Sequence, residues 1–175
     1  MRIDGEWLCC DDGIVRPVIR GDILAADGDW KAAEFLVDTG ADRTVLSALL
    51  LAKLDLTPIE TQQEYISGLG GAADSVVVET QIQFIREGGG QVIFRGHYAA
   101  ATAVDALDIS VLGRDVTDLF AVIVDRSRGI VCMLGQRHAF FRDFRAGDAN
   151  EAQNHRVTPV RCGIQEGQLI ANRIG

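Results

Sequence analysis

The sequence lacks the segments that direct a protein into or across a membrane. Its start, from Met1 to Glu6, is charged and is not followed by the apolar core of a signal peptide. No apolar run approaches the roughly 20 residues that a membrane-spanning helix needs. The 4 cysteines lack C-x-x-C spacing and include the adjacent pair Cys9 and Cys10, so they indicate neither a zinc site nor a disulfide framework. We therefore expect a cytoplasmic protein with reduced thiols and no membrane partner.

Blocks of positive charge and phosphate-binding motifs are also missing. The 17 Lys and Arg residues form no cluster, and the formal net charge of −8 argues against a nucleic-acid partner, because phosphate binding needs concentrated positive charge. The glycine-rich segment 67–71 is not followed by a G-K-[ST] motif or by a predicted helix, as a phosphate loop requires. The 3 histidines are scattered and show no metal-ligand spacing. We expect no metal and no cofactor.

Glycine is the residue that the sequence has in abundance. The 175 residues include 19 glycines, while 47% are hydrophobic and 24% are charged. This composition fits one globular domain with many turns, and it predicts an all-β or β-rich fold. We expect the domain to cover residues 1–135. The remaining segment, 136–175, is polar with little periodicity, so we expect an appendage or a partly disordered tail.

Apolar runs separated by turn residues predict the order of the strands. Ser47 stands in the position of a helix cap, which predicts a short helix that ends before Pro58. A second short helix is expected over 115–120, and residues 1–14 are polar and rich in turn residues. The last two strands are expected to be buried. The expected strands cover 14–24, 31–37, 61–66, 75–85, 91–97, 121–124 and 130–134.

One stretch combines a buried strand with residues suited to chemistry. The apolar run 35–37 ends in Asp38-Thr39-Gly40, and apolar residues resume at 44–46, which predicts a strand that delivers Asp38 onto a tight turn. A carboxylate can polarise a water, a hydroxyl can fix the turn, and a glycine lets another backbone approach closely. These residue types are also typical of an ordinary surface turn. From this motif alone, both interpretations stay open.

Two further motifs follow along the chain. Glycines surround Leu69 in the segment 66–71, at the tip of a predicted hairpin. Such a tip permits the opening motions typical of a lid, although a loose hairpin has the same sequence pattern. An alternating apolar run from 106 then ends at Gly113, which is followed by the charged pair Arg114 and Asp115.

In this order, the three motifs resemble those of the retroviral-type aspartic proteases, the retropepsins, with their cellular and bacterial relatives. The matching segments are LVDTGADRTVL from Leu36 to Leu46, ISGLGG from Ile66 to Gly71, and VLGRD from Val111 to Asp115. The resemblance spans about residues 15–134. It implies an all-β acid protease fold, a closed barrel or sandwich with a flap hairpin and one or two short helices. The implied activity is that of an aspartic endopeptidase acting on extended peptides.

By this resemblance, Asp38 is the catalytic carboxylate of the motif Asp38, Thr39 and Gly40. The chemistry needs two carboxylates, because one takes a proton from the attacking water while the other, protonated, hydrogen-bonds to the scissile carbonyl. No second Asp-Thr-Gly or Asp-Ser-Gly occurs in the 175 residues. We therefore expect a homodimer in which each subunit contributes one Asp38.

The remaining roles also come from the resemblance. Thr39 would bond to its counterpart across the two-fold axis, and Gly40 would offer its carbonyl to the substrate. Asp42 would bind the substrate main chain while it pairs with Arg114, whose alternative role is a solvated charge at the start of a helix. The expected substrate contacts are Leu36, Asp42, Ser67, Gly68, Leu69 and Val111, and the expected supports of the site are Ala41 and Arg114.

Two other questions concern function and assembly. The main alternative to a protease is a catalytically silent domain of the same fold that serves as a dimerisation or peptide-binding module. A metal or phosphate hydrolase is disfavoured, because the sequence offers no ligand cluster or phosphate loop. We also expect the hairpin over 121–134 to form the sheet between subunits, since it is the last apolar strand pair.

Overall fold

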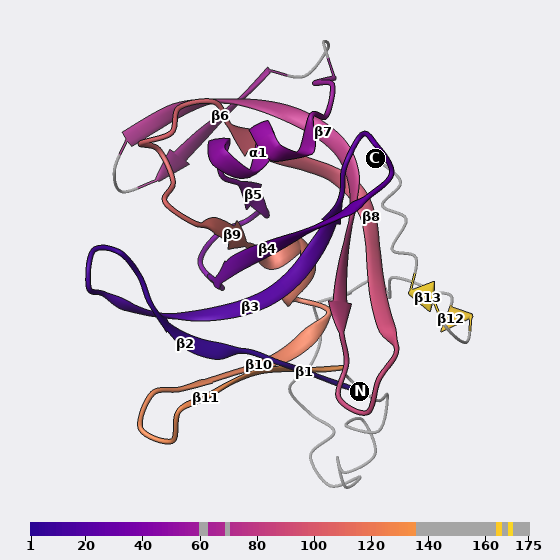
Figure 1. Ribbon diagram of the computed structural model, residues 1–175. Helices are drawn as coiled ribbons and strands as arrows, with labels where there is room; N and C mark the ends of the chain where they lie inside the picture. The colour runs from indigo at the N-terminus through magenta and orange to yellow at the C-terminus, as the bar shows by residue number, and fades with distance from the viewer. Residues whose placement is uncertain (60–62, 69–70, 136–163, 166–167, 170–175) are drawn as a thin grey trace, which may run out of the picture.

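The computed structural model describes residues 1–59, 63–68, 71–135, 164–165 and 168–169 (Figure 1). Strands dominate, with two short helices, which confirms the expected all-β fold class. The strands are β1 (Arg2–Asp4), β2 (Glu6–Cys9), β3 (Val15–Leu24), β4 (Trp30–Val37), β5 (Val45–Leu46), β6 (Gln63–Gly68), β7 (Gly71–Ile85), β8 (Gln91–Ala101), β9 (Ser110–Leu112), β10 (Phe120–Asp125), β11 (Ile130–Gly135), β12 (Ile164–Gln165) and β13 (Gln168–Leu169). The helices are α1 (Ala48–Leu54) and α2 (Arg114–Thr117). Within the described residues, no helix is long and apolar enough to cross a bilayer.

The main sheet closes on itself. Its strand order is β2-β3-β4-β9-β5-β8-β7-β6, and β3 also pairs with β7, with Ile23 opposite Ile82. Gly21 makes this crossing possible, because a Cβ there would lie 2.6 Å from the carbonyl oxygen of Gln83. The expected closed barrel-like arrangement is therefore present, and its closure depends on a glycine where two backbones meet.

A second, three-stranded sheet has the order β1-β11-β10. Figure 1 shows it at one end of the molecule, with the β6–β7 hairpin at the other. The N-terminal segment thus forms strands that its polar sequence did not predict, because pairing with β11 and β3 stabilises β1 and β2. The expected burial of 121–124 is wrong, since Ala121, Ile123 and Val124 are exposed on an edge strand.

The main core lies between the sheets and is rich in aromatic contacts. Phe84 packs edge to face against Phe35, with ring centroids 5.8 Å apart, and against Phe94 at 6.0 Å. Phe94 in turn contacts Phe120 at 6.0 Å, which joins β10 to the barrel. Helix α1 begins as expected at Ser47, whose Oγ accepts a hydrogen bond from the backbone N–H of Leu50. The helix then covers the core with Leu50 and Leu54, both buried.

Candidate active site

Strand β4 delivers Asp38 to the surface at the point where its pairing ends. β4 pairs in parallel with β9, with Leu36 opposite Val111 and Val37 opposite Leu112. The backbone N–H of Asp38 then donates to the carbonyl of Leu112 at 3.2 Å, so the hydrogen bonding between the two segments continues one residue beyond the strand. Because β9 and the main core hold β4, the position of the Asp38 backbone is set by buried structure.

The turn itself fixes the Asp38 carboxylate. The backbone N–H of Gly40 donates to Oδ1 of Asp38 at 2.8 Å, and the N–H of Ala41 donates to the Asp38 carbonyl at 3.3 Å. Asp38 is half-buried, whereas Thr39 and Gly40 are exposed. A side chain at Gly40 would bring a Cβ to 3.1 Å from Oδ1, which is a tight contact. The motif therefore presents an oriented carboxylate on an open loop.

The far end of the loop is attached to the segment that follows β9. The N–H of Arg114 donates to the carbonyl of Ala41 at 2.8 Å, which ties the loop to the start of α2. Gly113 allows this close approach, since a Cβ there would lie 2.2 Å from the carbonyl carbon of Arg43. The guanidinium of Arg114 also forms the expected ion pair with Asp42. The side chains of Arg114 and Asp42 are 50% and 78% exposed, so the pair contributes at most about 1 kcal/mol of stability.

A partly buried hydrogen-bond network that the sequence did not predict joins the same two segments. Oδ1 of Asp115 accepts from the backbone N–H of Thr44 at 2.9 Å and from its hydroxyl at 2.7 Å. The Thr44 hydroxyl oxygen accepts from the N–H of Gly113 at 3.1 Å. Both residues stand inside the quoted motifs, but their partners are 71 positions away in sequence, so no local pattern revealed the contact.

Two of the expected substrate-contacting residues meet in a small apolar cluster beside the loop. This second cluster has Val45, Ala99 and Val111 at its centre, and Leu36 and Ile66 pack against it. Ile66 belongs to β6, so the β6–β7 hairpin packs against the cluster that contains Val111. Leu107 and Ala41 also pack there and were not predicted to do so; the apolar run from 106 to 112 was the only sequence signal for Leu107.

The hairpin expected around the segment 66–71 is formed by β6 and β7. Ser67 pairs with Ala72 and Gly68 pairs with Gly71, whose φ of +112° favours glycine. Ser67 is exposed. Leu69, expected to close over the substrate, lies outside the described residues.

A family model described as aspartyl protease matches residues 23–116, which is more than half of the chain. The chain belongs to the aspartyl protease family. The match covers the Asp38 loop, the β6–β7 hairpin and Arg114, and it confirms the resemblance found from the three motifs.

Two solved structures are similar to this aspartyl protease family member. A retropepsin-like aspartic protease from Rickettsia conorii is 18% identical with a TM-score of 0.44, and the match covers 76% of this chain and 86% of that one. The EIAV protease, complexed with an inhibitor, is 24% identical with a TM-score of 0.43, and the match covers 63% and 93%. A search among curated proteins found no match. The family assignment therefore depends on the family model.

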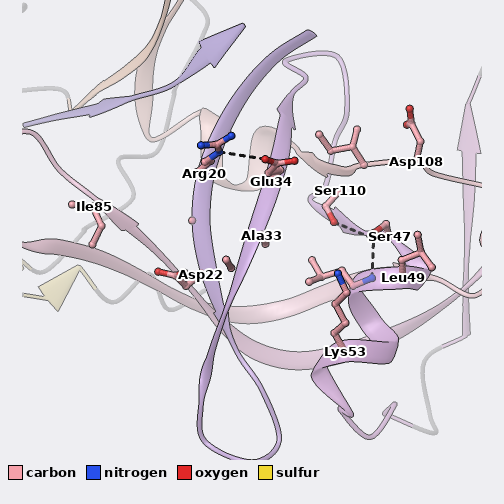
Figure 2. Close-up of a pocket in the computed structure, with 14 residues that line it drawn as sticks. Arg20, Asp22, Ala33, Glu34, Ser47, Leu49, Lys53, Ile85, Asp108 and Ser110 are labelled. Atoms are coloured by element: carbon pink, nitrogen blue, oxygen red, sulfur yellow. Dashed lines mark hydrogen bonds and ion pairs between the residues drawn. The ribbon is translucent and has the colours of Figure 1, made fainter. Parts of the chain in front are cut away.

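The aspartyl protease domain also has a groove of about 680 Å³ that none of the expected site residues lines (Figure 2). It lies between the β3–β4 hairpin, the start of α1 and residues 108–110. Figure 2 shows Arg20 paired with Glu34 and Ser47 beside Ser110, whose Oγ accepts from the Ser47 N–H at 3.0 Å. Acidic and basic side chains are mixed along it, so its chemistry favours no single class of ligand.

Proposed function

We propose that the protein is an aspartic endopeptidase that works as a homodimer and hydrolyses peptide bonds with a water activated between two Asp38 carboxylates. One observation carries the proposal. In a member of the aspartyl protease family, the single Asp-Thr-Gly places an oriented, accessible carboxylate at the end of a buried strand. The proposed substrate is an extended segment of a peptide or protein, and no metal or cofactor takes part.

The paired carboxylates would share one proton. Two carboxylates about 3 Å apart repel by roughly 5 kcal/mol at an effective dielectric constant of about 20, which corresponds to about four pKa units. The pair therefore titrates as a unit, and it is most active with a single proton. The ionised carboxylate takes a proton from the water while the protonated one hydrogen-bonds to the scissile carbonyl, so no covalent enzyme intermediate forms. We expect a bell-shaped, acidic pH profile of cleavage.

The surrounding residues would bind the substrate backbone and its side chains. Exposed Thr39 would bond to its counterpart across the two-fold axis, and the Gly40 carbonyl would accept from the substrate main chain. Asp42, held by Arg114, would bind the main chain farther from the cut. The second cluster supports apolar pockets, because Leu36 is only half-buried and Ile66 of the flap strand packs beside it. Ser67, Gly68 and Leu69 would cover the extended substrate.

We also propose a cytoplasmic location. The described cysteines, Cys9, Cys10 and Cys132, are all free thiols, which is typical of proteins in a reducing compartment.

The direct test is Asp38→Asn, assayed for cleavage of unfolded protein substrates at mildly acidic pH. We expect cleavage to fall to background, while Asp29→Asn, a matched change in the exposed β3–β4 turn, leaves it unchanged. Cleavage retained by Asp38→Asn would show that Asp38 is not catalytic. A wild-type chain that binds peptides without any turnover would instead support the alternative of a silent peptide-binding module.

A further inference from the structure

One edge of the long strand β8 is only partly covered by the other strands of the barrel. β7 pairs with β8 along its whole length, from Gln91 to Ala101. On the opposite edge, β5 pairs only at Ala99 and Ala100. Within the described residues, no strand pairs with this edge over 91–98, which we call the free edge of β8. Backbone groups that point away from β7 therefore have no partner strand there, and such an edge can accept an added strand.

The usual protections of an edge strand are missing from β8. Charged side chains, proline and bulges are the features that keep other strands from pairing with an edge. β8 contains no proline, and each of its residues lies opposite one residue of β7, so the pairing has no bulge. Arg95 is its one charged residue, and the guanidinium donates to Glu79 on β7 at 2.8 Å. This charge is therefore directed toward β7 rather than across the free edge.

A short hairpin from the C-terminal segment lies beside β8. β12 and β13 pair antiparallel, with Ile164 opposite Leu169 and Gln165 opposite Gln168, and they form a two-stranded sheet of their own. Cα atoms of β13 and β8 come within 8 Å of each other, and Figure 1 shows the hairpin on the side of β8 away from β7. A two-stranded hairpin alone is marginally stable in water, so β12 and β13 need a surface to pair with or pack against.

Charge and chain length favour the chain's own C-terminal segment as the occupant of the free edge. Residues 1–135 contain 11 Lys and Arg against 21 Asp and Glu, whereas residues 136–175 contain 6 Arg against 4 Asp and Glu. Opposite net charges attract the segment to its own domain. The 32 residues between β11 and β13 can span about 100 Å when extended, so the connection permits the return. Tethering also gives the segment an effective concentration on the order of 1 mM.

We propose that the free edge of β8 is the docking site of the chain's own C-terminal segment, and that β13 adds to it as a strand. Main-chain hydrogen bonds to the residues over 91–98 would supply the binding energy. The tail would then cover an edge that the side chains of β8 leave open. The proposal goes beyond the proposed function and does not depend on it, because strand addition needs neither catalysis nor a second Asp38.

The experiment measures amide hydrogen exchange of residues 91–98 in the full chain, residue by residue, by NMR. The double variant Gln168→Pro and Leu169→Pro removes both backbone N–H groups of β13. We expect the β8 amides that point away from β7 to exchange about 10-fold or more faster in this variant. Amides that pair with β7 should keep their rates. The matched control, Ala152→Pro and Gln153→Pro, changes the same tail outside the described strands and should exchange like wild type.

A free peptide tests whether the segment itself covers the edge. A peptide with the sequence of residues 163–171, added at millimolar concentration to the double variant, should restore slow exchange of the outward β8 amides. The same peptide with proline at both β13 positions should not restore it. Failure of the unmodified peptide to slow exchange would contradict strand addition by this segment.

Each outcome supports or overturns the proposal. Fast exchange of the outward amides in wild type overturns it, and so does slow exchange that is equal in wild type and double variant. Protection that is lost on dilution would show that the strand comes from another copy, which overturns docking within one chain. If the variant loses protection of the β7-paired amides as well, it has not folded, and nuclear Overhauser contacts between residues 91–98 and 168–169 in wild type then decide. Cleavage enters none of these measurements, so the proposed function stands or fails separately.

Discussion

The main core and the second cluster contain the same kinds of apolar side chain but differ in exposure. In the main core, side chains such as Phe35 and Phe84 are fully buried. In the second cluster, Leu36 on β4 and Ile66 on β6 are only partly buried, and Ala41 of the Asp38 loop packs against the same cluster. Apolar surface that is completely buried stabilises the fold, whereas apolar surface that stays reachable can gain further burial when a ligand binds.

Two paired strands, β4 and β9, separate these clusters. Phe35 and Val37 of β4 belong to the main core, while Leu36 between them belongs to the second cluster. Neighbouring residues of β9 are divided in the same way, since Leu112 belongs to the main core and Val111 to the second cluster. Because successive side chains of a strand point to opposite faces, the paired strands β4 and β9 have the main core on one face and the second cluster on the other. Asp38 directly follows the last residue of β4.

The largest expected effect comes from breaking the main core. Phe84→Ala should lower the free energy of unfolding by about 3–5 kcal/mol, because Phe84 is fully buried and contacts two other rings. Leu36→Ala in the second cluster should lower it by only about 1–2 kcal/mol, because the Leu36 side chain is half-buried and removes less apolar surface from water than a core side chain. Urea unfolding of both variants measures this difference. The difference between the two clusters is contradicted if Leu36→Ala lowers stability as much as Phe84→Ala, or if it leaves the KM for apolar substrates unchanged.

A smaller effect is expected at Gly113, where the segment after β9 meets the Asp38 loop. Gly113→Ala should lower the free energy of unfolding by about 2–3 kcal/mol and reduce cleavage, because its Cβ would collide with the backbone of Arg43. Gly96→Ala is the matched control, since a Cβ there meets only Tyr98 at 3.5 Å, and it should change stability by less than about 0.5 kcal/mol. Full activity of Gly113→Ala at wild-type stability would contradict the tight approach seen in the structure.

The smallest effect appears only at high pH. Burial, with a further contribution from the charge of Asp115, raises the pKa of the Tyr98 phenol above its ordinary value. The unfolded chain loses this proton near pH 10 while the folded chain keeps it, so stability present below pH 10 is lost as the pH rises, by up to about 1.4 kcal/mol per pH unit. Tyr98→Phe should remove this part of the slope in unfolding measurements between pH 9 and pH 11. An identical slope in wild type and variant would show that Tyr98 ionises freely.

Local sequence signals predicted the elements that depend on local chemistry. The strand into Asp38, the cap at Ser47 and the β6–β7 hairpin all follow from apolar periodicity and turn residues. The ion pair between Arg114 and Asp42 was expected from the resemblance alone and is present.

The features that the sequence did not reveal depend on distant partners. β1 and β2 are strands because β11 and β3 pair with them. The network of Thr44 and Asp115 forms only after β9 comes to lie beside β4 and β5. β10 is exposed because it is an edge strand of the three-stranded sheet, whereas its apolar sequence predicted a buried strand.

The hydrogen bonds that hold the Asp38 loop have a consequence for how cleavage depends on protein concentration. The contacts of the loop with Leu112, Arg114 and Asp115 all lie within one chain, so a single chain already holds a finished half-site. In the proposed dimer, assembly would join two half-sites that are each already formed within one chain. Below the dissociation constant, total cleavage rate would rise with the square of the chain concentration, and the amount of protein made would itself act as the switch.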